Sequence, residues 1–237
     1  LRQPQSLRPA LAGVSRAFLA LGDAPDQERM ECAFIEAARG AGVRHVVKLS
    51  AQSAGLPVPV SFGVVHRRIE QTLVQSGMAF TLLRPTFFQQ SLLLFASDVR
   101  RRGSFAAPAR HARIAMVDCR DVADVAVRCL GGPGFEGRVL TLTGPQAHSL
   151  PEVATLLGQV RGRPVRFTAL PSLVARVMLP FVSGMPRWQS NQVVDLFRAL
   201  ERGSQEHPTA DVQDVLARPA RPLPGFLAEH ADAFTGP

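Results

Sequence analysis

The chain of 237 residues has no tyrosine, a single tryptophan, a single lysine (Lys48) and three cysteines. Without tyrosine, mechanisms in which a phenol passes a proton to the substrate are excluded. The cysteines, Cys32, Cys119 and Cys129, are odd in number and widely spaced. They fit neither a disulfide framework nor a metal-ligand pattern, so we predict that they are small core residues in a reducing compartment.

Long apolar runs are also scarce. No stretch reaches the roughly 20 apolar residues that span a bilayer. The two most apolar stretches are 91–96, which is short, and 170–185, which Arg176 and two prolines interrupt. No signal-peptide pattern is present either. These absences favour a cytoplasmic protein without a membrane partner.

Basic residues outnumber acidic ones, so the net charge is +8 and the isoelectric point is about 11.1. Such a balance points to an anionic partner, either nucleic acid or an anionic cofactor. The arginines are scattered through the chain, and their one cluster, Arg100–Arg102, has no interleaved aromatic residues. The pattern therefore does not favour nucleic acid.

The rest of the pattern is organised around one strand–helix–strand unit. Residues 44–49 and 80–84 are short apolar runs typical of buried strands, and 62–75 between them has helical spacing. Parallel strands joined by a helix place their carboxyl ends at one sheet edge, where ligands of doubly wound sheets bind. We therefore expect function in the loops after Leu49 and Arg84.

Elsewhere, strands and helices alternate up to Thr143 and then give way mainly to helices. We predict an α/β fold with a doubly wound parallel sheet and a smaller, mostly helical C-terminal subdomain. Asp121 is the predicted N-cap of a helix over 122–130, and Ser149 that of a helix reaching 160. The other predicted elements are strands at 16–21, 114–117, 139–143 and 164–170 and helices at 7–13, 23–40, 172–181, 186–202, 212–217 and 226–234, with one helix ending near 99.

Four segments together resemble the NmrA-like family, an atypical branch of the short-chain dehydrogenase/reductases. They are Ala41–Ala51 (AGVRHVVKLSA), Ser76–Pro85 (SGMAFTLLRP), Val117–Ala123 (VDCRDVA) and Leu142–Pro145 (LTGP), in the order and spacing of the family. The C-terminal tail looks similar as well. The resemblance implies a partial Rossmann-like NAD(P)-binding domain over 1–145, interleaved with a substrate or lid subdomain over 146–237.

The strand–GxxGxxG–helix with which family members open, and whose amides hold the dinucleotide pyrophosphate, is not found here. Gly13, Gly22 and Gly40 stand alone. We infer that the sequence is N-terminally truncated by about three strands, which leaves strand 16–21 as an unpaired apolar edge. The implied cofactor is NADP or NAD, and the residue that distinguishes them would follow the missing second strand.

Short-chain dehydrogenases use a Tyr-x-x-x-Lys motif, and the two positions in this sequence are Phe62 and His66. Phenylalanine cannot transfer a proton. His66 therefore becomes the main candidate for catalysis and for contact with the cofactor, because imidazole donates and accepts hydrogen bonds near neutral pH. The alternative is a helix-surface histidine paired with Glu70 one turn further on.

The remaining candidates follow the predicted strands. By the resemblance, cofactor contacts fall on Leu21, Gly22, Ser50, Ala51, Gln52, His66, Pro85, Thr86 and Phe87, with Ser50 also a catalytic candidate and with Phe62 and Phe88 as walls of a substrate pocket. Ordinary polar turns and a buried helix start are alternatives at these positions. Arg84, Asp118 and Asp121 are interpreted as structural, and no metal site is expected.

Three functions stay open. The first is an NAD(P)H-dependent oxidoreductase of a small carbonyl, quinone or azo compound, because hydride transfer needs positioning more than an acid. The second is a non-catalytic NAD(P) redox sensor that regulates a protein partner. The third is an inactive truncated fragment that binds no cofactor. The aromatic pocket residues favour the enzyme, and the missing proton donor favours the sensor.

Overall fold

The computed structural model describes residues 1, 3–57, 60–182 and 184–235. The chain divides into two compact units, each made of several chain segments. The first unit comprises Leu1–Pro85, Val122–Leu142 and Asp214–Leu216, and the second comprises Thr86–Asp121, Thr143–Gln213 and Ala217–Pro237.

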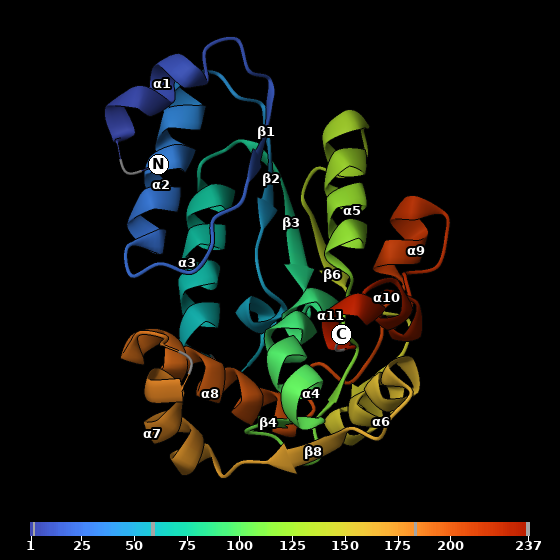
Figure 1. Cartoon of the computed structure of the whole chain (residues 1–237). Coiled ribbons are helices and arrows are strands. Elements are labelled where there is room, and N and C mark those ends of the chain that lie inside the picture. Colours follow the sequence, from blue (N-terminus) through green and yellow to red (C-terminus); the bar gives the residue numbers. More distant parts are fainter. Residues whose placement is uncertain (2, 58–59, 183, 236–237) are drawn as a thin grey trace. The chain divides into compact units, whose positions relative to one another are not determined.

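The first unit is built on a sheet of four parallel strands in the order β1-β2-β3-β6. The strands are β1 (Arg16–Leu19), β2 (His45–Leu49), β3 (Ala79–Pro85) and β6 (Arg138–Leu142). Helices α2 (Gln27–Gly40) and α3 (Ser61–Gln75) lie on one side of the sheet and α5 (Cys119–Gly131) on the other, as Figure 1 shows. The predicted α/β class and the central strand–helix–strand unit are confirmed.

Apolar side chains hold α2 and α3 on this sheet. Ile35 and Ala38 of α2 and Ile69 and Leu73 of α3 are at most 1% exposed and belong to one apolar cluster. Their spacing of three or four residues puts them on one helix face, which explains why these segments fold as helices against a sheet. The unit also contains η1 (Pro4–Ser6), α1 (Leu7–Ala10) and the 3-10 turn η2 (Gln52–Gly55).

Strand β1 is an edge of this sheet, since among the described residues it pairs only with β2. The side chain of Phe18 is 42% exposed, so the apolar edge that the sequence predicts at 16–21 is present. Arg16 on the same strand donates from Nη1 to the carbonyl oxygens of Leu130 and Gly132. These bonds satisfy carbonyl groups at the C-terminal end of α5.

One glycine triplet, Gly131, Gly134 and Gly137, does have GxxGxxG spacing. It links the end of α5 to the start of β6, so it runs from helix to strand. A pyrophosphate cradle needs the opposite order, because the amides that hold the phosphates belong to a helix N-terminus. The spacing alone therefore does not make this loop a cofactor site.

The second unit contains two small sheets and a set of helices. Strand β4 (Ser104–Ala107) pairs in parallel with β8 (Arg166–Ala169), and β5 (Arg113–Ile114) pairs antiparallel with β7 (His148–Ser149). The helices are η3 (Gln89–Phe95), α4 (Ala96–Arg102), α6 (Leu150–Arg161), α7 (Ser172–Val182), α8 (Arg187–Glu201), α10 (Leu223–Glu229) and α11 (Ala231–Phe234). Leu157, Phe226 and Phe234 lie in its apolar core. Ser149 forms the predicted N-cap of α6, in a capping box with Glu152.

The second unit includes more of the chain than the predicted subdomain over 146–237, because residues 86–121 belong to it. The sequence pattern did not predict β4, since its Ser-Phe-Ala-Ala run carries no β-branched residue. The helix expected to end near 99 divides into η3 and α4, and the one expected over 226–234 divides into α10 and α11. Helix α9 spans Asp211–Leu216.

The prediction that Asp121 caps a helix over 122–130 is wrong. Helix α5 starts at Cys119, and the Asp118 carboxylate accepts a hydrogen bond from the backbone N–H two residues further on (2.8 Å). Asp121 instead accepts hydrogen bonds from Arg218 and Arg221, so its role is structural, as interpreted, through a different contact. In the described part of the chain, no helix is both long and apolar enough to cross a membrane.

Candidate functional site

The carboxyl ends of β2 and β3 meet at one edge of the sheet in the first unit. The backbone N–H of Ser50 donates to the carbonyl oxygen of Leu83 (2.7 Å), so the loop after β2 starts beside β3. Ser50 is buried and Ala51 partly buried, and Gln52, also partly buried, is the first residue of η2. The juxtaposition expected from a strand–helix–strand unit is therefore present.

His66, the main candidate, lies on α3 and is only 7% exposed. Its Nδ1 is 3.4 Å from Nζ of Lys48. Burial, reinforced by the charge of Lys48, lowers the pKa of His66 to about 3. The alternative of a surface histidine paired with Glu70 is wrong, because Glu70 contacts Ser50 and Arg84 instead.

Lys48 is completely buried and forms an ion pair with Glu31 of α2, with Nζ 2.5 Å from Oε2. Nζ also donates to the carbonyl oxygen of Leu49 (3.1 Å), and Gln27 donates to the other Glu31 oxygen (2.8 Å). Burial lowers the pKa of Lys48, and the Glu31 carboxylate counteracts this shift. Neither member of the pair is among the predicted site residues. The one signal was the only lysine of the chain, standing inside the apolar run of β2.

A second polar cluster joins Ser50, Glu70 and Arg84. The Ser50 hydroxyl donates to Oε1 of Glu70 (2.6 Å), and Arg84 donates from Nε and Nη2 to the two Glu70 oxygens (3.0 and 2.6 Å). Since the one hydroxyl proton of Ser50 is engaged, its oxygen has only lone pairs left to offer a ligand. The bidentate Arg84–Glu70 pair fixes α3 to the end of β3, which agrees with the structural interpretation of Arg84.

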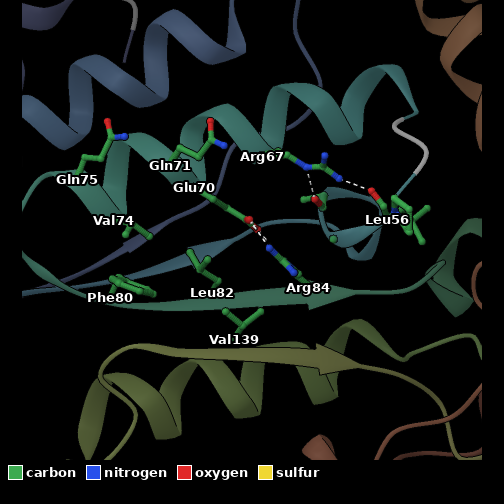
Figure 2. Close-up of a pocket in the computed structure, with 13 residues that line it drawn as sticks. Leu56, Arg67, Glu70, Gln71, Val74, Gln75, Phe80, Leu82, Arg84 and Val139 are labelled. Carbon is green, nitrogen blue, oxygen red and sulfur yellow. Dashed lines mark hydrogen bonds and ion pairs between the residues drawn. The ribbon is translucent and has the colours of Figure 1, made fainter.

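A cavity of about 590 Å³ in the first unit has none of the predicted site residues in its lining. Figure 2 shows Gln71, Val74 and Gln75 of α3 along one wall, with Phe80 of β3 and Val139 of β6 across from them. The cavity therefore opens on a face of the sheet. Ligands of doubly wound sheets bind beyond the carboxyl ends of the strands, so we place the candidate site at the ends of β2 and β3 and not in this cavity.

The three candidates that follow β3 belong to the second unit. The Thr86 hydroxyl donates to a backbone carbonyl of that unit (2.6 Å), and the backbone N–H of Phe87 donates to the Gln205 side chain (2.7 Å). Phe88 is partly buried and forms a β-bridge with Val117. These contacts give all three a packing role in the second unit, and their contact with a cofactor or substrate stays a prediction.

The other candidates belong to the first unit. Leu21 is partly buried and Gly22 exposed just after β1, Pro85 is the buried last residue of β3, and Phe62 is partly buried in the first turn of α3. Their roles also remain predictions. Among the described residues, no cluster of three or more His, Cys, Asp or Glu side chains could hold a metal ion.

Comparison with known proteins gives one family and several reductases. The model of the NmrA-like family matches residues 1–217. An NAD(P)H azoreductase from Xenophilus azovorans is 37% identical over 234 residues, which cover 99% of this chain and 82% of that protein. A (4-alkanoyl-5-oxo-2,5-dihydrofuran-3-yl)methyl phosphate reductase from Streptomyces griseus is 37% identical over 235 residues, covering 97% of this chain and 80% of that protein.

Solved structures give the same fold at lower identity. An NADPH-dependent quinone oxidoreductase from Escherichia coli, solved in complex with NADPH, matches with a TM-score of 0.87 at 24% identity and covers 97% of this chain and 80% of its own. NmrA, a negative transcriptional regulator solved with NAD, matches with a TM-score of 0.76 at 17% identity, covering 95% of this chain and 76% of its own. At these identities the likeness shows the fold alone.

Proposed function

The chain belongs to the NmrA-like family, and we propose that it is an NAD(P)H-dependent oxidoreductase of a small carbonyl, quinone or azo compound. The observation that carries the proposal is the 37% identity, over 99% of the chain, with an NAD(P)H azoreductase. A second curated reductase has the same identity over 97% of the chain. The proposal keeps the cytoplasm, where nicotinamide cofactors are available, as the expected location.

The chemistry fits a chain without tyrosine. A bound nicotinamide supplies the hydride, and the protein supplies orientation and hydrogen bonds. Phe62 stands at the position of the usual proton donor and cannot act as one. A quinone or azo acceptor tolerates this, since water can protonate the reduced oxygen or nitrogen once hydride has been delivered. The quinone and azo compounds in the proposal follow from this tolerance.

The residues at the ends of β2 and β3 fit the nicotinamide end of such a cofactor. His66 has a second ring nitrogen, Nε2, besides the Nδ1 that contacts Lys48. Ser50 keeps lone pairs on its oxygen, in a loop fixed by Glu70 and Arg84. Because the sequence has no strand–GxxGxxG–helix, we assign the pyrophosphate to none of its residues.

The remaining assignments follow the same reasoning, with Leu21, Gly22, Ala51, Gln52, Pro85, Thr86 and Phe87 proposed for cofactor contacts and Phe62 and Phe88 for the substrate. A group that reads the 2′-phosphate is not among these residues, so NADH and NADPH are both candidates. The small-molecule acceptor is the proposed partner of the site.

A non-catalytic redox sensor with a regulatory protein partner is the second candidate. The observation that favours it is the absence of the tyrosine acid, together with a fold shared with the regulator NmrA. The enzyme is the stronger proposal because both relatives at 37% identity are reductases.

Steady-state oxidation of NADPH and NADH in the presence of a naphthoquinone, an azo dye and an aldehyde tests the proposal, with calorimetric titration of each cofactor alongside. We expect turnover with the quinone or the dye and a reduced rate in His66→Gln. His111→Gln, a change at an exposed histidine of the second unit, is the control and should leave the rate unchanged. Cofactor binding without turnover across the panel would favour the sensor, and no binding of either cofactor would reject both candidates.

A further inference from the structure

The only lysine of the chain is fully buried against the main candidate residue. The Lys48 ammonium carries three N–H groups, and three acceptors surround it in the first unit. These are Oε2 of Glu31 at 2.5 Å, the carbonyl oxygen of Leu49 at 3.1 Å and Nδ1 of His66 at 3.4 Å. Each N–H therefore has one partner, and one of the three partners is the His66 ring.

This contact fixes where the imidazole proton sits. An ammonium group has donors and no acceptor, so the His66 nitrogen that faces Lys48 must present a lone pair. In a neutral ring the proton is then on Nε2. Gln27 donates to the remaining oxygen of Glu31 (2.8 Å) and holds the carboxylate that keeps the lysine in place.

We propose that Lys48 is a positioning residue that holds His66 as a neutral imidazole protonated at Nε2. In this form His66 donates one hydrogen bond to an uncharged carbonyl oxygen of the cofactor or substrate. It does not act as an imidazolium acid. The oxygen acceptors of this chemical class are the carboxamide of nicotinamide and the carbonyl of a quinone or aldehyde. This inference rests on the proposed function of the site.

The charged groups around the ring agree with a neutral form. Two carboxylates could favour an imidazolium, Glu31 from α2 and Glu70 from α3, but each is paired with a cation of its own. Lys48 lies 2.5 Å from Glu31, and Arg84 lies 2.6 Å from Glu70. Cys32 on α2 also raises the pKa of Lys48. With both carboxylates paired, the net influence on His66 is burial and the Lys48 ammonium, which lower its pKa to about 3.

The test reads the tautomer directly, by NMR of the full chain labelled with 15N in histidine. We expect the His66 signals to show an unprotonated Nδ1 and a protonated Nε2 that do not titrate between pH 5 and pH 8. His66→Gln assigns the signals by removing them. A proton on Nδ1 of His66, or titration of His66 near the ordinary pKa of about 6.5, would overturn the proposal from this measurement alone.

The role of Lys48 is tested by the double change Lys48→Met/Glu31→Gln, which leaves no buried charge unpaired. We expect the His66 ring to lose its single tautomer and its pKa to move up toward the ordinary value. The matched control is Arg68→Met/Glu28→Gln, an exposed pair between α3 and α2 (3.3 Å, side chains 61% and 42% exposed), which should leave the His66 signals unchanged. If the Lys48 double variant folds and keeps the wild-type tautomer and titration, Lys48 does not position His66.

The donated hydrogen bond is tested by adding NADPH and then a naphthoquinone to the labelled protein. We expect one of the two to shift the Nε2–H signal of His66 downfield and a cofactor dissociation constant that stays within twofold between pH 5.5 and pH 8. An unmoved Nε2–H signal in a protein that turns over substrate would overturn this inference and keep the proposed function. The predicted tautomer in a protein that binds no cofactor would instead reject the proposed function.

Discussion

The two compact units bury charge in different ways. In the first unit, the Lys48–Glu31 pair is cut off from solvent on both sides, with both side chains 0% exposed. In the second unit, Asp121 is equally buried, but its partners Arg218 and Arg221 are 36% and 33% exposed and keep contact with water. Asp118, also 0% exposed in the second unit, likewise pairs with an arginine, Arg120, whose side chain is 44% exposed.

The difference in solvent exposure between the two ion pairs bears on whether each one serves stability or function. A fully buried ion pair contributes little more to stability than apolar packing of the same volume, because both charges lose their hydration. The Asp121 cluster reduces that cost, since about a third of each arginine side chain stays exposed to solvent. The Lys48–Glu31 pair has no such relief, so a positioning role for it, toward His66, explains its presence better than stability does.

The largest expected loss of stability comes from removing one member of the buried Lys48–Glu31 pair, which leaves the other charge without a partner. Lys48→Met removes the cation that is paired with the Glu31 carboxylate and should lower the free energy of unfolding by about 4 kcal/mol. Urea titration followed by circular dichroism measures this. The control is Arg68→Met, which breaks the exposed pair with Glu28 and should cost no more than about 1 kcal/mol. A loss below about 1 kcal/mol for Lys48→Met would mean that Glu31 is not buried as a charged group.

The apolar core of the second unit gives the next effect. Leu157 is 0% exposed within that core, and Leu157→Ala should cost about 3 kcal/mol, since it removes buried surface and leaves a cavity. Leu173→Ala is the control, because Leu173 on α7 is 72% exposed and its truncation should change stability by less than about 0.5 kcal/mol. Equal costs for the two leucines would contradict the burial that the structure gives them.

The pH dependence of stability tests the charge state at the centre of the first unit. The pKa of His66 is about 3 in the folded chain and about 6.5 when unfolded. Between these pH values only the unfolded chain binds the proton. The neutral His66 side chain therefore makes its full contribution to folding stability above pH 6.5, and this contribution is lost as the pH falls toward 3. From pH 7 to pH 4.5, we expect His66 to contribute a loss of roughly 2.5 kcal/mol.

Thermal or urea unfolding at several pH values measures that slope, and His66→Gln should make it shallower. The matched control is His207→Gln, a change at an exposed histidine that should leave the slope as it is. If His66→Gln and the unchanged protein lose stability in parallel on acidification, His66 is charged or solvent-accessible in the folded state.

The elements whose signals are local could be predicted from the sequence. The strands at β2 and β3 and the helix α3 follow from apolar runs and helical spacing, and the cap at Ser149 follows from the Ser-x-x-Glu pattern. In the candidate site, the same signals placed Ser50 at the end of a strand, because a strand–helix–strand unit fixes which loops meet. His66, in the second turn of α3, was found instead through the resemblance to the Tyr-x-x-x-Lys motif.

The partners of buried polar groups could not be predicted, because they come from distant parts of the chain. Asp118 and Asp121 are equally good N-caps by local pattern, and only arginines 97 and 100 residues away from Asp121 decide its role. Lys48 likewise stands inside an apolar strand, and the helix that supplies Glu31 was predicted only as an amphipathic face. Tertiary packing decides which polar side chains are buried, and the local hydrophobic periodicity of a sequence does not show this packing.

The smallest effect tests the feature of the second unit that local signals predict completely. Ser149 accepts a hydrogen bond from the backbone N–H of Glu152, and the Glu152 side chain accepts one from the backbone N–H of Ser149. Ser149→Ala removes half of this box and should cost about 1 kcal/mol. Thr155→Ala, at an exposed position of the same helix, is the control, since it removes a hydroxyl of similar size without touching the cap. A cost near 1 kcal/mol here, set against about 4 for Lys48→Met, would measure how much less a solvated polar contact contributes than a charge enclosed in the protein interior.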